Sequence, residues 1–240
     1  STACSWDVEL IGKIGSAIAE EAADQGVGLF LGPGVNIKRN PLCGRNFEYF
    51  SEDPYLAGKL AASFIKNAQK NGIGTSLKHF ACNNQEYKRF NSDSILDDRT
   101  LREIYLAPFE IAVREGKPKT VMCAYNKING IYCSDNKELL THILRDEWGF
   151  EGVVVTDWGA MYDRIAAFKA GCDLNMPGGS NYMAQEVLDA VARGELDEAD
   201  IDRSVQRIKK MVLEAQQAIK NKKSCDYQAH HELARMAAEQ

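Results

Sequence analysis

The sequence lacks the long apolar stretches and the strongly basic regions that define several large classes of protein. No apolar run approaches the ~20 residues that a membrane-spanning helix needs. The formal net charge of -5 offers no basic surface for the phosphates of a nucleic acid. We therefore expect neither a membrane nor a nucleic acid as a partner.

Disulfide and metal signatures are also missing. The seven cysteines are odd in number, are dispersed and include no C-x-x-C pair. Several lie in apolar, strand-like segments, which favours buried free thiols in a reducing compartment and a cytoplasmic protein. No H-E-x-x-H motif, EF-hand loop or G-x-G-x-x-G loop is present. We therefore expect no metal and no organic cofactor.

The sequence does contain a repeating order of short apolar strand, polar or glycine-containing loop, and amphipathic helix. The apolar patterns predict strands over residues 27–33, 75–81, 120–125, 152–156 and 172–176. Helix patterns and capping residues predict helices over residues 7–24, 53–72, 99–115, 135–149, 161–170, 182–192 and 201–220, with another after Asp226. We expect Pro108 to bend or divide its helix, and Ser134 or Asp135 to cap the next one.

Strands that alternate with helices in this way indicate parallel βαβ units in an α/β protein. We favour a (β/α)8 barrel of the TIM type over a doubly wound sheet, because the glycine-rich phosphate loop of the latter is absent. A regular barrel has eight strands, and this pattern supplies five. The barrel is therefore expected to be incomplete or irregular.

Polar and aromatic residues follow the expected strands, where barrel enzymes carry their active sites. Asp157 directly follows the strand over residues 152–156, a position typical of a nucleophile or general base. The structural alternative is that Asp157 caps the helix expected near Met161. Trp158 could stack its indole on a sugar ring, or belong to the core or the rim.

Basic residues follow the earlier strands. Lys78 and His79 lie near a strand end, where the turn of the chain could bring both to one site. The alternatives are a salt bridge for Lys78 and a hydrogen-bonded core position for His79. Arg45 lies in the loop after the first strand, where pairing with Glu48 or Asp53 would pin that loop instead.

Two further features are candidates for binding hydroxyl groups. Tyr125 could donate its phenol to a carboxylate of the site, or lie in the core. An unusually polar stretch follows the second strand, and its side chains could bind hydroxyls or cap turns: Asn83, Asn84, Gln85, Glu86 and Arg89.

Four segments together resemble the barrel motifs of family 3 glycoside hydrolases and occur in that family's order. They are GRNFEYFSEDP (44–54), KHFACNNQE (78–86), MCAYNKING (122–130) and VVTDWGA (154–160). The resemblance implies that Asp157 is the catalytic nucleophile and Tyr125 its neighbour. It also implies that Arg45, Lys78, His79 and Arg89 bind sugar hydroxyls, and that Trp158 forms an aromatic wall.

The departures from the family pattern carry information too. The Pro-Gly-His-Gly loop of the N-acetylhexosaminidase branch is missing after Phe80, which favours the glucosidase-like branch. In that branch the acid/base is usually a glutamate of a following α/β sandwich domain, and the family's Asp-Gly-Pro motif is absent here. We therefore expect residues 1–240 to form part of the N-terminal barrel domain, with a linker starting at about residues 221–240. The sandwich domain, or a partner chain, would supply the acid/base.

The resemblance thus implies a retaining exo-acting β-glycosidase, most simply a β-glucosidase acting on a β-glucoside or a short oligosaccharide. β-Xylosidase or α-arabinofuranosidase activity is the nearest alternative. A Schiff-base lyase that uses Lys78 is a second alternative, and a non-catalytic carbohydrate-binding fragment is a third. Because retaining hydrolysis uses two carboxyl groups, the isolated chain is expected to be inactive or very weak.

Overall fold

A four-stranded parallel sheet forms the centre of the computed structural model, which describes residues 2–221 and 224–240. The strand order is β1-β2-β4-β7, and every neighbouring pair is parallel. The strands are β1 (Leu29–Phe30), β2 (Gly74–Phe80), β4 (Thr120–Cys123) and β7 (Val153–Thr156). Because each crossover between them is helical, their carboxyl ends all meet at one edge of the sheet.

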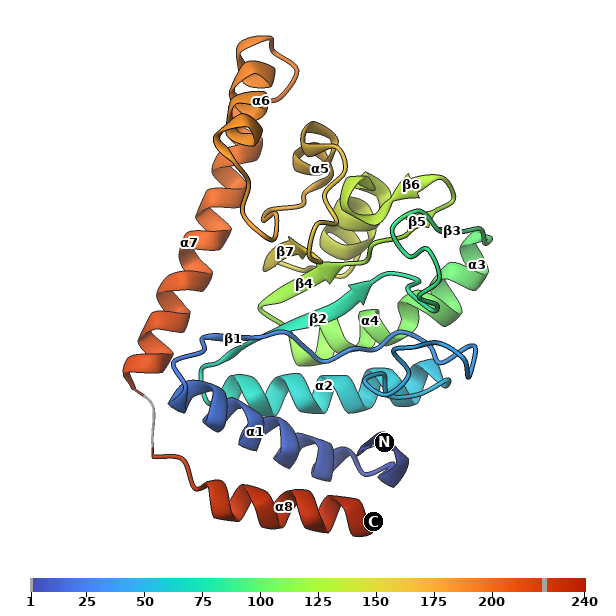
Figure 1. Ribbon diagram of the computed structural model, residues 1–240, viewed down its shortest axis with the longest axis vertical. Coiled ribbons are helices and arrows are strands. Elements are labelled where there is room, and N and C mark those ends of the chain that lie inside the picture. The colour runs from blue at the N-terminus through green and yellow to red at the C-terminus, as the bar shows by residue number, and fades with distance from the viewer. Residues whose placement is uncertain (1, 222–223) are drawn as a thin grey trace.

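Helices surround this sheet, as Figure 1 shows. The α-helices are α1 (Val8–Asp24), α2 (Pro54–Lys70), α3 (Asp98–Thr100), α4 (Ala107–Ile111), α5 (Arg164–Ala170), α6 (Asn181–Ala192), α7 (Glu198–Lys220) and α8 (Tyr227–Glu239). Segments with 3₁₀ geometry are η1 (Thr2–Ser5) and η4 (Cys133–Asp135), and those with π geometry are η2 (Leu101–Leu106), η3 (Ala112–Gly116) and η5 (Glu138–Glu147). Within these described residues, no helix is long and apolar enough to cross a membrane.

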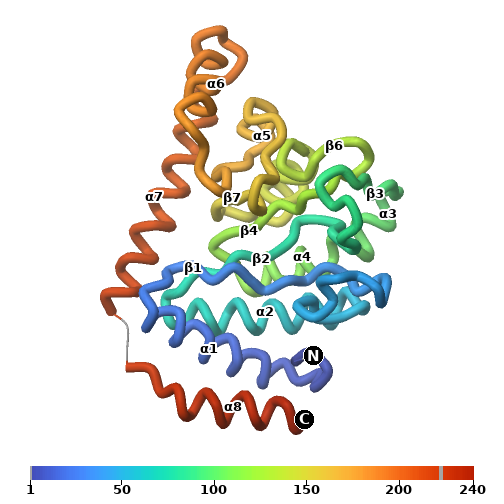
Figure 2. The backbone as a smooth tube through the Cα atoms, viewed as in Figure 1, coloured from blue at the N-terminus to red at the C-terminus, as the bar shows by residue number. Residues whose placement is uncertain are grey.

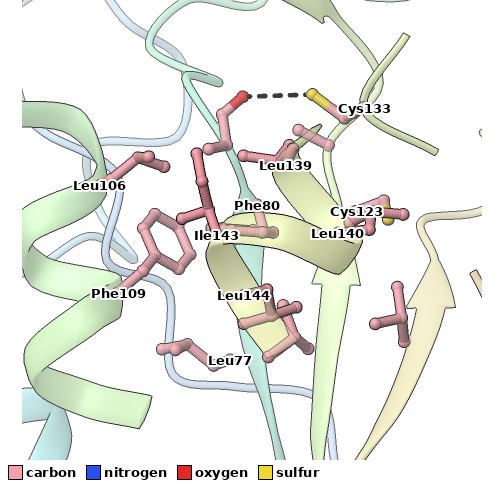
Figure 3. Close-up of a cluster of buried hydrophobic side chains, with 14 of the residues drawn as sticks. Leu77, Phe80, Leu106, Phe109, Cys123, Cys133, Leu139, Leu140, Ile143 and Leu144 are labelled. Atoms are coloured by element: carbon pink, nitrogen blue, oxygen red, sulfur yellow. Dashed lines mark hydrogen bonds between the residues drawn. The ribbon is translucent and has the colours of Figure 1, made fainter. Parts of the chain in front are cut away.

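One face of the sheet packs against η2, α4, η3 and η5. Alternate strand residues such as Leu77, Val121 and Val154 point toward this side, since successive side chains of a strand face opposite ways. Phe80 meets Phe109 with ring centroids 5.1 Å apart. Figure 3 shows the side chains of β2 and β4 interleaved with those of the surrounding helices. This layer is the helix-covered outside of a barrel.

On the opposite face of the sheet, α7 packs against β4 and β7. Met122, Val153 and Val155 pack there against Ile208 and Met211. In Figures 1 and 2, α7 runs along the edge of the body rather than within the ring of crossover helices. The face that would line the inside of a closed barrel is therefore partly covered by a helix. The four strands of this sheet form only part of a (β/α)8 barrel, so the barrel is incomplete, as expected.

The predicted strands at residues 75–81, 120–125 and 152–156 are confirmed by β2, β4 and β7. The first predicted strand is shorter and less buried than expected, because only Leu29 and Phe30 form β1 and both are half-buried. The amide of Gly32 donates to the carbonyl of Phe30 and turns the chain, and Pro33 has no N–H to give to the sheet. Pairing with β2 then resumes, where the amide of Val35 donates to β2.

The predicted strand at residues 172–176 is wrong: the segment makes a single bridge, between Leu174 and Val155. Its neighbour Asp173 accepts the amide of Val154 with its side chain, at 2.8 Å. A carboxylate thus occupies a position that a strand would fill with a backbone carbonyl.

Capping explains where most of the predicted helices begin. The Asp7 side chain accepts the amides of Glu9 and Leu10 at the start of α1, and the Asp53 side chain accepts the amide of Leu56 at the start of α2. The cap expected at Ser134 or Asp135 is wrong. Asn136 accepts the amide of Leu139 instead, while the Ser134 hydroxyl donates to Asp135.

The helix continues without a break through Pro108, so the expected division is not seen, but the hydrogen-bond pattern changes on both sides of this residue. The turns widen to π geometry over Leu101–Leu106, return to α over Ala107–Ile111, and widen again over Ala112–Gly116. A proline has no N–H to donate back along the helix, so a local change of pattern here has a direct cause.

A second, small sheet lies beyond the carboxyl ends of the main strands. It joins β3 (Asp93–Ser94), β5 (Lys127–Ile128) and β6 (Ile131–Tyr132) in the order β3-β5-β6. The β5–β6 hairpin turns through Asn129 and Gly130, which both have positive φ, the combination that a tight two-residue hairpin turn needs. This sheet ties the loop after β2 to the loop after β4.

The last helix, α8, packs along α1 and runs antiparallel to it (Figure 2). Tyr227 accepts a hydrogen bond from Gln25 and donates one to Asp24, and His230 lies 2.9 Å from Glu21 and 3.2 Å from Glu20. Part of the expected linker is thus a docked helix, although residues 222–223 lie outside the described residues. That the segment leads to a further domain stays a prediction.

Candidate active site

The candidate nucleophile, Asp157, directly follows β7, with its backbone amide bonded to the carbonyl of Cys123 in β4. Its Oδ1 accepts the amide of Trp158 at 2.7 Å. Its Oδ2 is buried and has no hydrogen-bond partner among the described residues. The capping alternative is wrong, because Asp163 caps α5 by accepting the amide of Ala166. Asp157 therefore has one carboxylate oxygen that the fold leaves unused.

Two of the predicted partners face that oxygen. His79 Nε2 lies 3.5 Å and Arg45 Nη1 lies 3.8 Å from Asp157 Oδ2. Arg45 comes from the loop after β1 and His79 from the end of β2. Three segments well separated in sequence therefore converge on one carboxylate.

Glu48 holds the two cations of this site in place. Its Oε1 accepts a short hydrogen bond from Arg45 Nε, and its Oε2 lies 3.2 Å from Lys78 Nζ. Burial opposes ionisation of Glu48, but the hydrogen bond from Arg45 and the charge of Lys78 outweigh it and lower the pKa of Glu48. The expected pairings of Arg45 and Lys78 with a carboxylate are thus present, and Arg45 in addition lies 3.8 Å from Asp157 Oδ2.

His79 is buried to 1% exposure, and its Nδ1 lies 3.1 Å from the phenol oxygen of Tyr49. Burial, together with the charges of Arg45, Lys78 and Arg89, lowers its pKa well below the usual value. The imidazole is therefore neutral over the whole physiological range. The core interpretation is confirmed on one side of the ring, and on the other side Nε2 faces Asp157, where a role in binding stays a prediction.

Arg89 and Tyr125 form the next part of the site. The Arg89 guanidinium carbon lies 4.4 Å from the centroid of the Tyr125 ring, and Glu86 accepts from Arg89 Nη1 at 2.8 Å. The Tyr125 phenol donates to the carbonyl of Trp158 at 3.0 Å. Burial and the charge of Asp157 raise the pKa of Tyr125 to about 12, so the phenol keeps its proton.

Trp158 lies at the rim, with 54% of its surface exposed. Its backbone amide and carbonyl are bound by Asp157 and Tyr125, so its main chain is fixed while its indole meets solvent. An exposed indole beside a carboxylate suits contact with the apolar face of a sugar.

The polar stretch after β2 both holds the loop and lines the site. Asn84 donates to the carbonyl of Ile37, which fixes the loop to the segment after β1. Asn83 donates to Glu86 and to Tyr49, each at 3.1 Å. Sequence reasoning did not single out Tyr49, which is 1% exposed, and a lone tyrosine in a loop gives no signal of such a contact.

Parallel βα units, with a carboxylate, basic side chains and an exposed indole gathered at the strand ends, are the arrangement of a barrel whose site lies at the carboxyl ends of its strands. The sequence profile of the glycosyl hydrolase family 3 N-terminal domain matches residues 1–211, and the chain belongs to this family.

Relatives with assigned names agree with this placement. Thermostable β-glucosidase B of Acetivibrio thermocellus is 53% identical over 236 residues, which is 98% of this chain and 31% of that protein. An exo-α-(1→6)-L-arabinopyranosidase of Bifidobacterium breve is 49% identical over 235 residues, again 98% of this chain and 31% of its own length. The chain thus spans about a third of these relatives.

Solved structures show the same fold. The GH3 β-glucosidase of Bifidobacterium adolescentis superimposes with a TM-score of 0.94 at 46% identity, covering 99% of this chain and 35% of that one. β-Glucosidase 3B of Thermotoga neapolitana in complex with α-D-glucose gives a TM-score of 0.93 at 45% identity, covering 98% of this chain and 34% of that one. The fold of this chain is therefore part of a TIM-type barrel.

Proposed function

We propose that the protein to which this chain belongs is a retaining exo-acting β-glycosidase, most simply a β-glucosidase, with Asp157 as its nucleophile. The observation that carries the proposal is Asp157 Oδ2, a buried carboxylate oxygen at a strand end without a hydrogen-bond partner in the described residues. Relatives named as β-glucosidases support the choice of substrate.

The chemistry follows from this geometry. In the first step, a lone pair of Asp157 Oδ2 attacks the anomeric carbon and the bond to the leaving-group oxygen breaks, which gives a glycosyl ester. In the second step, water cleaves that ester with net retention of configuration. The carboxylate must be free to bond to carbon, and Oδ2 fits this role while Oδ1 is held by the amide of Trp158.

The surrounding side chains would bind and orient the sugar. Arg45, Lys78 and Arg89 present N–H donors on side chains that Glu48 and Glu86 hold still. Fixed donors to the hydroxyls would hold the anomeric carbon near Asp157, and much of the rate enhancement of enzymes comes from such positioning. His79 would add a neutral N–H donor, Trp158 a stacking surface and Tyr125 support for the loop of Asp157.

We further propose that the acid/base comes from outside residues 1–240, on a C-terminal α/β sandwich domain or a partner chain. Retaining enzymes place their two carboxyl groups about 5 Å apart. The nearby carboxylates Glu48 and Glu86 are each tied to an arginine, and Glu48 to Lys78 as well. A carboxylate held in this way cannot readily donate a proton. The chain alone would therefore be inactive or very weak.

The direct test is Asp157→Asn in the protein that contains this chain, assayed on an aryl β-glucoside. We expect turnover to fall by more than about 10³-fold, because the covalent step is lost. Asp146→Asn, at an exposed position on η5, is the matched control and should leave turnover unchanged. Near-normal hydrolysis by Asp157→Asn would contradict the assignment.

A second experiment identifies the covalent intermediate itself. A fluorinated glucoside that forms the glycosyl ester quickly and releases it slowly should add one sugar mass to the peptide containing Asp157. Labelling of a different carboxylate would place the nucleophile elsewhere while leaving the retaining mechanism intact.

The substrate could also be an arabinoside or a xyloside, since one relative is named as an arabinopyranosidase. Comparing kcat/KM for aryl β-glucoside, β-xyloside and α-arabinosides separates these cases. We expect the glucoside to be preferred, and a clear preference for a pentoside would correct the substrate while leaving Asp157 in its role.

We also propose a reducing compartment such as the cytoplasm. All seven cysteines are free, and five of them are buried: Cys43, Cys82, Cys123, Cys133 and Cys172. Burial raises the pKa of Cys133 to about 12, so that thiol stays protonated and unreactive. Free thiols in a core are typical of proteins that function where disulfides do not form.

A further inference from the structure

A series of hydrogen bonds connects His79 through Tyr49 and Asn83 to Glu86. Which group donates and which accepts in each bond is determined at the end farthest from the imidazole. That end is Glu86, whose carboxylate pairs with Arg89 at 2.8 Å through Oε2. A carboxylate oxygen can only accept hydrogen bonds. Glu86 Oε1 lies 3.1 Å from the side chain of Asn83, so the group facing it must be the NH₂ of Asn83.

The orientation of Asn83 fixes the role of Tyr49. The same NH₂ lies 3.1 Å from the phenol oxygen of Tyr49, which must therefore accept. The phenol proton is then free to be donated, and His79 Nδ1 lies 3.1 Å away. Burial raises the pKa of Tyr49 above its usual value, so this proton is present at every physiological pH.

The role of Tyr49 in turn fixes the proton on the imidazole. Nδ1 of His79 accepts from Tyr49, and a neutral imidazole carries its one N–H on the other nitrogen. Nε2 therefore bears the proton, and it lies 3.5 Å from Asp157 Oδ2. The opposite tautomer would turn a lone pair of Nε2 toward the carboxylate oxygen, which is repulsive. Both ends of the ring thus favour the same tautomer.

We propose that Tyr49 and Asn83 are positioning residues that hold His79 as its Nε2–H tautomer, so that the site presents an N–H donor beside Asp157. The value of this donor to a sugar hydroxyl rests on the proposed function, but the tautomer itself does not. Neither residue faces Asp157 directly, since Asn83 acts through Tyr49 and Tyr49 acts through His79.

The test is the tautomer, measured by ¹⁵N NMR on this chain with histidine-selective labelling. The chain has four histidines, and His142, His230 and His231 serve as internal references for an intact fold. In the unsubstituted chain, His79 Nε2 should carry the proton, and Nδ1 should show the ¹⁵N chemical shift of an unprotonated nitrogen that accepts a hydrogen bond. Protonation of Nδ1 instead would overturn the proposal.

Two substitutions act on the chain of hydrogen bonds in different ways. Tyr49→Phe removes the donor to Nδ1, and the loss of one neutral hydrogen bond should raise the proportion of the Nδ1–H form about 5-fold. Asn83→Asp replaces the NH₂ by a carboxylate oxygen, which would accept the phenol proton. Nδ1 of His79 should then become the donor to Tyr49, and the tautomer should invert.

Tyr55→Phe is the matched control, since Tyr55 is a largely exposed phenol on α2 and should leave the signals of His79 unchanged. If neither Tyr49→Phe nor Asn83→Asp raises the proportion of the Nδ1–H form while the reference histidines show an intact fold, the positioning role is refuted. Loss of turnover plays no part in this readout. A wrong nucleophile assignment would therefore leave the result for Tyr49 and Asn83 standing.

Discussion

Two cationic side chains of the site depend on a single neighbour. The carboxylate of Glu48 pairs with both Arg45 and Lys78 and so holds both in position. Replacing Glu48 by glutamine keeps the shape and removes the charge. Hydrogen bonds to charged groups contribute about 1.5–3 kcal/mol each. We therefore expect kcat/KM in the protein containing this chain to fall roughly 10- to 100-fold.

The control for this variant is Glu52→Gln, an exposed glutamate four residues along the same loop. Kinetics on an aryl β-glucoside separate the two. If Glu48→Gln behaves like Glu52→Gln, the two cations do not need their shared carboxylate.

His79 gives a prediction about pH and stability. Its pKa is lowered in the folded protein, so the folded state stays neutral while the unfolded state gains a proton below the ordinary histidine pKa of 6.5. The unfolded state then binds more protons, and stability must fall as the pH drops below that value. One such group contributes up to about 1.4 kcal/mol per pH unit.

Urea unfolding of this chain between pH 7 and 5 measures that slope. His79→Gln should flatten it, whereas His142→Gln, at an exposed position on η5, should not. An unchanged slope in His79→Gln would mean that this imidazole takes up a proton in the folded state as readily as in the unfolded one.

The residues of the site were largely predictable, but their arrangement was not. Asp157, Arg45, Lys78 and His79 stand out because polar side chains at strand ends have few structural roles. The hydrogen-bond partner of His79, by contrast, lies 30 positions away on another loop. Tyr49 carries no mark of that contact in the sequence, because loop geometry rather than local pattern brings the two together.

At the scale of elements, the buried carboxylate of Asp173 joins β7 to α7. Its Oδ2 accepts from Arg145 at 2.7 Å and from the amide of Val154, and its Oδ1 accepts from Ser204 and Arg207, each at 2.9 Å. Breaking a buried ion pair leaves a charge without its partner and costs about 3–5 kcal/mol. We expect Asp173→Asn to lower the free energy of unfolding by that amount.

Chemical denaturation of this chain and of Asp202→Asn, an exposed position on α7, tests the prediction. A loss below about 1 kcal/mol for Asp173→Asn would show that the remaining hydrogen bonds suffice. Hydrogen exchange should also place the largest change at β7 and α7.

Elements with strong local signals were predictable, and those that depend on distant partners were not. Aspartates at residues 7 and 53 began helices as their capping chemistry predicts. The segment at residues 172–176 has an apolar pattern but makes a single backbone bridge to β7, beside which the side chain of Asp173 accepts the amide of Val154. The hydropathy pattern of a segment does not show whether its hydrogen bonds to the neighbouring strand come from its backbone carbonyls or from a side chain such as that of Asp173.

At the scale of the whole molecule, the first turns of α8 make polar contacts with the end of α1, and apolar side chains such as Ile18 and Leu233 line the space between the two helices farther along. None of the residues of α8 is buried, and His230 sits between Glu20 and Glu21. We expect His230→Ala to raise amide exchange rates in α8 about 5-fold or more while leaving β2 and β4 unchanged, since about 1 kcal/mol of local stability is lost.

Hydrogen exchange followed by mass spectrometry checks this expectation, with His231→Ala as the control at an exposed neighbouring position. Equal exchange in both variants would mean that apolar contacts hold α8. That α8 docks on α1 was beyond sequence reasoning, since the two helices are separated by about 200 residues.

The packing of α7 against β4 and β7 has a consequence for folding during synthesis on the ribosome. Met122, Val153 and Val155 leave the ribosome before Ile208 and Met211, which cover them in the finished structure. At about 5–20 residues per second, the 53 residues from Thr156 to Ile208 take roughly 3–10 s to synthesise. During that interval the nascent chain carries an uncovered apolar sheet face, a surface to which chaperones bind.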